Sequence, residues 1–126
     1  MRNLKSRTLK GFTLIELLVV VAIIGILASV GVYSYVGYIE GTKTKTAKNV
    51  MQQIALKQTE RYTDLGSYYS GSDINTNLFD GGNVANVSGY TFSVTATVSG
   101  YSIVAAKDDG SCITLNDLMI EGTTCP

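Results

Sequence analysis

Glu16 is the residue of this sequence whose position points most clearly to chemistry. It stands one turn inside an apolar run, and residues 17–36, which follow it, contain no charged side chain. A carboxylate at membrane depth costs about 3 kcal/mol or more, so it is a functional candidate by default. Just before it, Gly11, Phe12 and Thr13 separate a basic leader from the apolar run. Glu16 is therefore the first candidate for a functional residue.

The second candidates for a chemical role are Cys112 and Cys125, the only cysteines of the chain. In a small exported domain, an isolated pair of cysteines favours a disulfide. Closing the loop between them would contribute about 3 kcal/mol in the chain-entropy model. The alternative is a pair of reduced thiols.

The sequence contains no recognisable set of catalytic or metal-binding residues. The chain has no histidine, and its serines and threonines have no evident base. Asp108, Asp109 and Gly110 form the one acidic cluster that suggests a cation site, but calcium needs six to eight oxygens and two aspartates supply too few. We predict a solvated turn there, no metal, no cofactor and no enzymatic activity.

The first two elements are a leader and a membrane helix. A helix over residues 17–36 spans roughly 30 Å, about the thickness of a bilayer core. Positive charge before such a helix keeps that end in the cytoplasm. A removed signal peptide or a plain anchor would also fit, but neither explains Glu16 beside Gly11 and Phe12. The basic residues of the leader are Arg2, Lys5, Arg7 and Lys10.

Helical character continues beyond the membrane segment. Apolar residues recur over residues 38–62 at steps of three and four, which predicts one helix from about Thr13 to Tyr62 with an amphipathic second half. The positions of this stripe are Ala47, Val50, Met51, Ile54, Ala55 and Gln58. Residues 63–89, rich in Gly, Ser, Asn and Asp, predict a long connection. Within it, Asn86, Val87 and Ser88 match a glycosylation acceptor, and we interpret them as a turn.

Three or four strands follow. Residues 90–98 alternate between apolar and hydroxyl side chains, which predicts a half-buried strand, and Ser99 and Gly100 predict a two-residue hairpin turn. Residues 101–106 are predicted to form the second strand and residues 107–110 the next turn. Residues 112–115 are predicted to form a third strand, with a fourth around residues 118–120. We expect this meander to pack on Val50, Ile54 and Leu56.

The charge distribution argues against nucleic acid as a partner. From Tyr62 onward, Lys107 is the only basic residue against seven acidic ones, a net charge of −6 that repels phosphate. Residues 41–61 are basic, and this stretch could instead pair with acidic neighbours. We expect that the protein does not bind DNA.

Gly11, Phe12, Thr13, Leu14, Ile15 and Glu16, followed by an unbroken apolar helix, closely resemble the start of type IV prepilins with a class III leader. The pseudopilins of type II secretion share this start. The resemblance implies that a prepilin peptidase cuts between Gly11 and Phe12 and N-methylates Phe12. It also implies that Glu16, with Thr13 beside it, acts in assembly of a filament. The segment ERYTDLGSYYS, residues 60–70, resembles the end of the long helix in a subgroup of minor pilins.

The resemblance implies an α+β pilin fold, with a long N-terminal helix packed on a small antiparallel sheet. We expect a cleaved leader (1–11), a transmembrane and filament-core helix (12–40) and a periplasmic or extracellular domain (41–126). Many type IV pilins have a proline where this chain has Tyr33, and that proline is associated with local unwinding of the helix in the filament. For this chain, which lacks the proline, the resemblance does not decide whether the helix unwinds.

The implied function is that of a structural subunit of a type IV pilus serving adhesion, twitching motility or DNA uptake. It would be stored in the inner membrane, with its N-terminus in the cytoplasm, and then assembled into a surface fimbrium. Its partners would be other pilin subunits, the peptidase, the inner-membrane assembly machinery and the lipid bilayer. The alternatives are a secretion pseudopilin, which the cysteine pair disfavours, and a minor pilin that acts as a receptor for DNA or surfaces.

Overall fold

A computed structural model describes residues 10–84 and 89–126. The expectations for most of the leader, residues 1–9, and for the turn at residues 86–88 lie outside these ranges. The chain divides into two compact units between Tyr38 and Ile39. The first holds the start of the long helix, and the second holds the rest of the helix with the sheet, called the head below.

The helix α1 (Leu14–Leu65) has 52 residues and is continuous through Gly25, Gly31, Gly37 and Gly41. The prediction of one helix from about Thr13 to Tyr62 is confirmed. The helix ends where Gly66 adopts a positive φ of 69° and its amide donates to the carbonyl oxygen of Tyr62 at 2.8 Å. A glycine in this left-handed conformation satisfies a carbonyl of the last helical turn and stops the helix.

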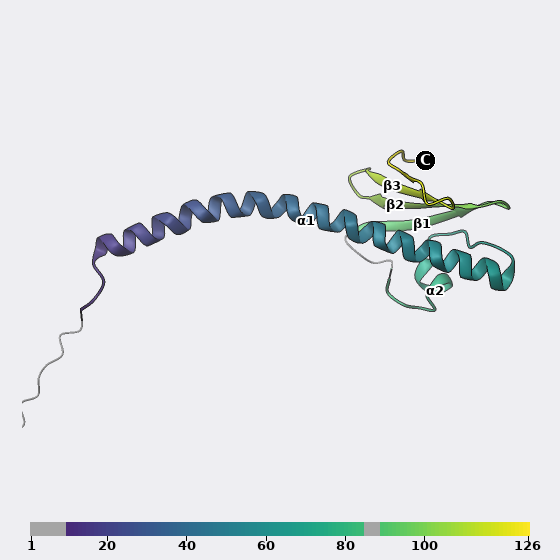
Figure 1. Ribbon diagram of the computed structural model, residues 1–126, viewed down its shortest axis with the longest axis horizontal. Coiled ribbons are helices and arrows are strands. Elements are labelled where there is room, and N and C mark those ends of the chain that lie inside the picture. The colour runs from purple at the N-terminus through teal and green to yellow at the C-terminus, as the bar shows by residue number, and fades with distance from the viewer. Residues whose placement is uncertain (1–9, 85–88) are drawn as a thin grey trace, which may run out of the picture. The chain divides into compact units, whose positions relative to one another are not determined.

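The predicted meander is present as a four-stranded antiparallel sheet in the order β1-β2-β3-β4. The strands are β1 (Tyr90–Ala96), β2 (Tyr101–Lys107), β3 (Cys112–Asn116) and β4 (Glu121–Gly122). Figure 1 shows β1, β2 and β3 lying along the C-terminal part of α1. The head therefore has the predicted α+β architecture, with a helix packed against one face of an antiparallel sheet.

The core of the head lies between α1 and this face of the sheet. Ile54 and Met51 of the helix are buried together with Phe92, Val94 and Ile103 of the strands. The predicted stripe is confirmed throughout, since the buried residues of α1 are Ala47, Val50, Met51, Ile54, Ala55 and Gln58.

The prediction that Leu56 packs under the sheet is wrong, because its side chain is 68% exposed. Leu56 follows Ile54 by two positions, and a helix turns about 200° over two residues at 3.6 residues per turn. The sheet covers the side of α1 that carries Ile54, so Leu56 faces away from it.

The predicted turn between β1 and β2 is also wrong, by one position. Ala96 pairs with Tyr101, and the Thr97 amide donates to the Gly100 carbonyl at 2.8 Å, so Val98 and Ser99 occupy the turn. A turn at Ser99 and Gly100 would have shifted the register by two residues. That shift leaves every side chain on the same face, so alternation alone cannot distinguish the two registers.

The fourth strand was predicted around residues 118–120, but these residues form the turn that precedes β4. The side-chain oxygen of Asn116 accepts hydrogen bonds from the Leu118 and Ile120 amides, at 3.1 and 2.8 Å. Met119 has a positive φ of 60°. A side-chain carbonyl that accepts backbone amides favours a turn over a strand.

The connection between α1 and β1 is more ordered than its composition predicts. It contains α2 (Ile74–Leu78), in which Ile74 and Leu78 are buried. The side chain of Asp73 caps this helix by accepting from the Thr76 amide at 3.3 Å. Gly71 exchanges two backbone hydrogen bonds of 2.9 Å with Val94, which extends the sheet edge at β1.

Candidate functional site

The helix α1 begins with a reciprocal pair of hydrogen bonds between Thr13 and Glu16. The Glu16 amide donates to the Thr13 hydroxyl oxygen at 3.3 Å, and the Thr13 amide donates to Glu16 Oε2 at 2.9 Å. This is a capping box, which satisfies two amides that the first turn of a helix leaves without carbonyl partners. Thr13 and Glu16 are thus brought together at the helix start.

The sequence reasoning missed this cap, although its signal is present in the sequence. A threonine followed three residues later by a glutamate, just before an apolar run, is the pattern of a capping box. From the sequence, Glu16 is interpreted as a carboxylate at membrane depth and as an assembly residue, but not as part of a helix cap. The structure gives the carboxylate a local role in addition, inside its own chain.

Gly11 and Phe12 lie in the non-helical residues before α1, and both are exposed. The Phe12 side chain is 92% exposed. An exposed, non-helical backbone is the form in which a peptide bond is accessible to a peptidase. The predicted cleavage junction therefore lies in non-helical chain next to the capped start of the helix.

None of the described residues of the first unit, 10–38, is buried. An 18-residue window of α1 has a mean hydropathy of 2.7, and none of this window is buried. The exposed large side chains include Ile15, Leu17, Leu18 and Val21. Apolar surface of this extent is stable where lipid or another apolar surface covers it, and the window is long enough to cross a membrane.

Comparison with known proteins agrees with this geometry. Residues 7–32 match the family described as "Prokaryotic N-terminal methylation motif". The chain carries a class III leader motif. The matched range contains the Gly11–Phe12 junction, the Thr13–Glu16 cap and the start of the apolar helix. The resemblance inferred from Gly11 to Glu16 is confirmed for this segment.

The chain is also similar to the fimbrial protein EcpC of Eikenella corrodens. The two are 42% identical over 57 residues, a match that covers 45% of this chain. The same match covers 37% of the relative, so the chain spans little more than a third of that protein's length.

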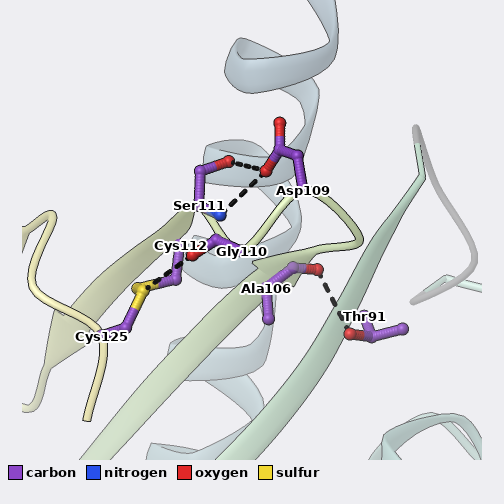
Figure 2. Close-up of a disulfide and its surroundings, with 7 residues drawn as sticks. All are labelled: Thr91, Ala106, Asp109, Gly110, Ser111, Cys112 and Cys125. Atoms are coloured by element: carbon purple, nitrogen blue, oxygen red, sulfur yellow. Dashed lines mark hydrogen bonds between the residues drawn. A yellow bond between two sulfur atoms is a disulfide. The ribbon is translucent and has the colours of Figure 1, made fainter.

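Cys112 and Cys125 are joined by a disulfide, as predicted. Figure 2 shows that Cys112 lies at the start of β3 and that Cys125 comes from the C-terminal segment beside it. The sulfur of Cys125 also lies 3.5 Å from the Gly110 carbonyl oxygen. The bond therefore fastens the end of the chain to the β2–β3 corner of the sheet.

The acidic cluster at Asp108 and Asp109 lies in the predicted turn, which the Gly110 amide closes by donating to the Lys107 carbonyl at 3.0 Å. The Asp109 carboxylate accepts from both the hydroxyl and the amide of Ser111 (Figure 2). These two hydrogen bonds lower the pKa of Asp109, with a smaller contribution from Lys107. The carboxylate is thus held by the turn itself.

Much of the charge on the basic part of α1 is paired inside the head. Lys48 contacts Glu121 of β4 at 2.7 Å, and Lys43 and Lys57 contact glutamates three residues away. The Arg61 guanidinium lies over the Tyr69 ring at 5.7 Å. The expectation that DNA is not a partner stays a prediction.

Lys107 connects β2 to α1. Its ammonium lies 2.6 Å from a carboxylate oxygen of Glu40 and 5.9 Å from the centre of the Tyr90 ring. The hydrogen bond to Glu40 is the main cause that raises the pKa of Lys107. The hydroxyl of Tyr90 in turn lies 3.4 Å from that of Thr44, so this edge of the sheet is fixed to the helix by polar contacts.

Proposed function

We propose that this protein is a type IV pilin, a membrane-stored subunit that is cut, N-methylated and assembled into a surface filament. The observation that carries the proposal is the methylation motif of residues 7–32, which includes the start of α1, together with an apolar 18-residue window of this helix that is not buried. The similarity to a fimbrial protein and the disulfide-closed end of the head support it.

In this proposal, prepilin peptidase cleaves after Gly11 and methylates the new terminus at Phe12. The basic leader stays in the cytoplasm, the apolar half of α1 crosses the inner membrane, and the head lies outside. Assembly transfers the apolar half of α1 from lipid to contacts with neighbouring subunits, which keeps it out of water in both states.

Glu16 is the proposed assembly residue, and Thr13 positions it. Cleavage before Phe12 leaves the Thr13 amide in place, so the capping box survives in the mature chain. The cap engages Oε2, and among the described residues no hydrogen bond is formed to Oε1. That oxygen can meet the positively charged Phe12 amine of an adjacent subunit, and the contact relieves the desolvation cost of both charges.

Intact-mass measurement of the protein from membranes and from sheared fibres tests the proposal. The expected mass is that of a chain beginning at N-methyl-Phe12 with one disulfide. A chain that keeps Met1, or one that begins near Gly31 after signal-peptide cleavage, would contradict the pilin proposal. Abundance in the sheared fibres separates the variants of the proposal: a dominant band indicates a major pilin, traces indicate a minor pilin, and absence favours a pseudopilin.

A further inference from the structure

A groove of about 450 Å³ lies at the end of the head where α1 stops. We call it the terminal groove. The last turn of α1 and the segment after it form one wall, with Tyr62, Ser67 and Tyr68. The turn between β1 and β2 forms the other wall, with Thr97 and Val98. No part of the cap, the methylation motif or the disulfide belongs to it.

Stacked aromatic rings form one side of the terminal groove. The Tyr62 and Tyr68 rings lie 4.5 Å apart with an angle of 19° between their planes. Tyr68 in turn packs against Tyr101 at 5.1 Å, and Tyr101 is buried in the core. Tyr62 is 45% exposed, although an aromatic ring is usually drawn into a core or an interface. The rings thus form a supported platform with an accessible outer member.

Both walls are held in place before any ligand binds. Gly66 fixes the exit from α1, and Gln58 clamps Tyr69, directly after Tyr68, through two hydrogen bonds of 2.7 and 2.8 Å. Across the groove, the Ser70 hydroxyl bridges to Val94 and Ala96 of β1. A site that needs no ordering on binding keeps more of its contact energy as affinity.

The lining carries no charged side chain, which restricts the chemistry of a ligand. The polar groups available are the hydroxyls of Tyr62, Tyr68 and Ser67. The Thr97 hydroxyl is already bonded to the Gly100 carbonyl oxygen. Nearby charges are acidic: Asp117 lies against Gly100, and Asp64 is on the last turn of α1. An anionic ligand would be repelled, and the lining residues include no carboxylate that could form an ion pair with a cation.

Val98 completes the surface at the tip of the β1–β2 turn, where it is 99% exposed. A ligand that matches the groove must present an apolar face to Tyr62 and Val98 and hydroxyl groups to the tyrosine and serine hydroxyls. A sugar ring has both, because its C–H groups form flat apolar faces and its hydroxyls lie at the edge. Rigid tyrosines with serine hydroxyls also form adaptable binding surfaces in other recognition sites.

We propose that the terminal groove binds a neutral oligosaccharide, with one sugar ring stacked on Tyr62 and its hydroxyls bonded to Tyr62, Tyr68 and Ser67. The assignment does not depend on whether the chain is built into a filament. It gives the head a ligand-binding function of its own, at the end of the head where α1 stops.

The test uses the full-length protein in a zwitterionic detergent, because detergents with sugar headgroups would compete. Maltotriose, cellotriose and triacetylchitotriose are the neutral probes, and sialyllactose is the anionic one. Saturation-transfer NMR detects binding, and tyrosine fluorescence gives the affinity, since the chain has no tryptophan. We expect at least one neutral probe to saturate in the millimolar range and sialyllactose to bind more weakly.

Three variants locate the site. Tyr62→Leu keeps apolar bulk but removes the ring, and it should weaken saccharide binding about tenfold. Tyr62→Phe keeps the ring and should retain most of the affinity. Tyr35→Leu, an exposed tyrosine outside the groove, should change nothing. Circular dichroism and non-reducing electrophoresis confirm that each variant is folded.

Four results would overturn the proposal. The first is that no neutral probe binds at tens of millimolar. The second is that the affinity stays the same in Tyr62→Leu, and the third is that sialyllactose binds more tightly than the neutral probes. The fourth is a concentration-dependent dimer that Tyr62→Leu abolishes while no saccharide binds, which would assign the groove to a second copy of the chain.

Discussion

Gln58 shows how one buried polar residue organises a segment that composition describes only as a loop. Its side chain is fully buried, and its amide exchanges two hydrogen bonds with the backbone of Tyr69, as a neighbouring strand would. Burying an amide costs free energy unless its donors and acceptors are satisfied. The sequence predicted that Gln58 belongs to the buried stripe, but its partner lies in a segment without periodicity and could not be foreseen.

Gln58→Leu should destabilise the head strongly. The substitution removes the side-chain partner of the partly buried Tyr69 amide and carbonyl, which costs about 1–3 kcal/mol for the two hydrogen bonds together. Urea unfolding followed by near-UV circular dichroism of the tyrosines measures the change. Gln53→Leu is the matched control, because Gln53 is exposed on the same helix and should shift the free energy of unfolding by less than about 0.5 kcal/mol. Equal effects of the two variants would contradict the clamp.

Asp109 gives the head a dependence on acid pH. Its pKa is lowered from the ordinary value of 3.8, chiefly by the hydrogen bonds from Ser111. A carboxylate with a lowered pKa in the folded state contributes stability above the ordinary pKa, and this contribution is lost as pH falls through the lowered one. Melting temperatures between neutral pH and pH 2 should therefore fall less in Asp109→Asn than in the wild type.

Asp108→Asn is the control for this titration, because Asp108 is an exposed carboxylate in the same turn. Its melting curve should follow that of the wild type over the acid range. If the melting temperatures of Asp109→Asn, Asp108→Asn and the wild type all fall by the same amount between neutral pH and pH 2, the hydrogen bonds from Ser111 to Asp109 do not stabilise the folded head. Lys107 acts in the opposite range, since its raised pKa adds stability that is lost as alkaline pH rises through it.

At the scale of elements, α1 was the most predictable part of the chain. Its first half is apolar on all sides and its second half has a stripe with a period near 3.6, so both halves predict a helix in different surroundings. Its start was less predictable: the sequence put Thr13 at the beginning of the helix without identifying the cap. Local hydrogen bonds of this kind follow from short spacings and are visible once the spacing is checked.

The strands were predictable as segments but not in their register. Alternation over residues 90–96 identifies a half-buried strand, whereas the choice between two hairpin registers depends on contacts outside the strand. In the observed register the large ring of Phe92 lies opposite the small Ala105, and Val94 lies opposite Ile103. The fourth strand was misplaced because Asn116 accepts hydrogen bonds from the Leu118 and Ile120 amides, a local turn that the apolar residues 118–120 do not reveal.

The disulfide is the element that closes the head, and its removal has a predictable cost. Replacing Cys112 and Cys125 by serine should lower the free energy of unfolding by about 3 kcal/mol, because the C-terminal loop is no longer closed in the unfolded chain. Urea unfolding under non-reducing conditions measures the difference. Wild-type protein treated with reductant should unfold like the double variant, and an unchanged midpoint in both samples would contradict a stabilising role.

For the whole molecule, the central question is whether Glu16 serves its own helix or a neighbouring subunit. The capping box shows that the carboxylate has a partner within the chain, so a loss of fibres in Glu16→Ala would not by itself separate the two roles. Glutamine also completes a capping box. Glu16→Gln therefore keeps the helix cap and removes the charge, and it separates the two roles directly.

If the charge of Glu16 meets the Phe12 amine of an adjacent subunit, Glu16→Gln and Glu16→Ala should both insert and be cleaved normally but assemble few fibres. If the cap is what matters, Glu16→Gln should assemble nearly as well as the wild type. Sheared-fibre yield, divided by the amount of cleaved protein in the membrane, is the measurement. Thr13→Ser, which keeps the cap and the charge, is the matched control and should assemble normally.

Co-expression of Glu16→Gln and wild-type subunits gives a further test that distinguishes a contact between subunits from a helix cap. Each subunit supplies one amine and one carboxylate, so a Glu16→Gln subunit placed among wild-type neighbours keeps the contact made by its own amine. It should therefore enter wild-type fibres far more readily than it forms fibres alone, and mass spectrometry of sheared fibres gives the ratio. A variant that is excluded from mixed fibres as completely as from its own would contradict a contact shared between subunits and favour a defect that each chain carries alone.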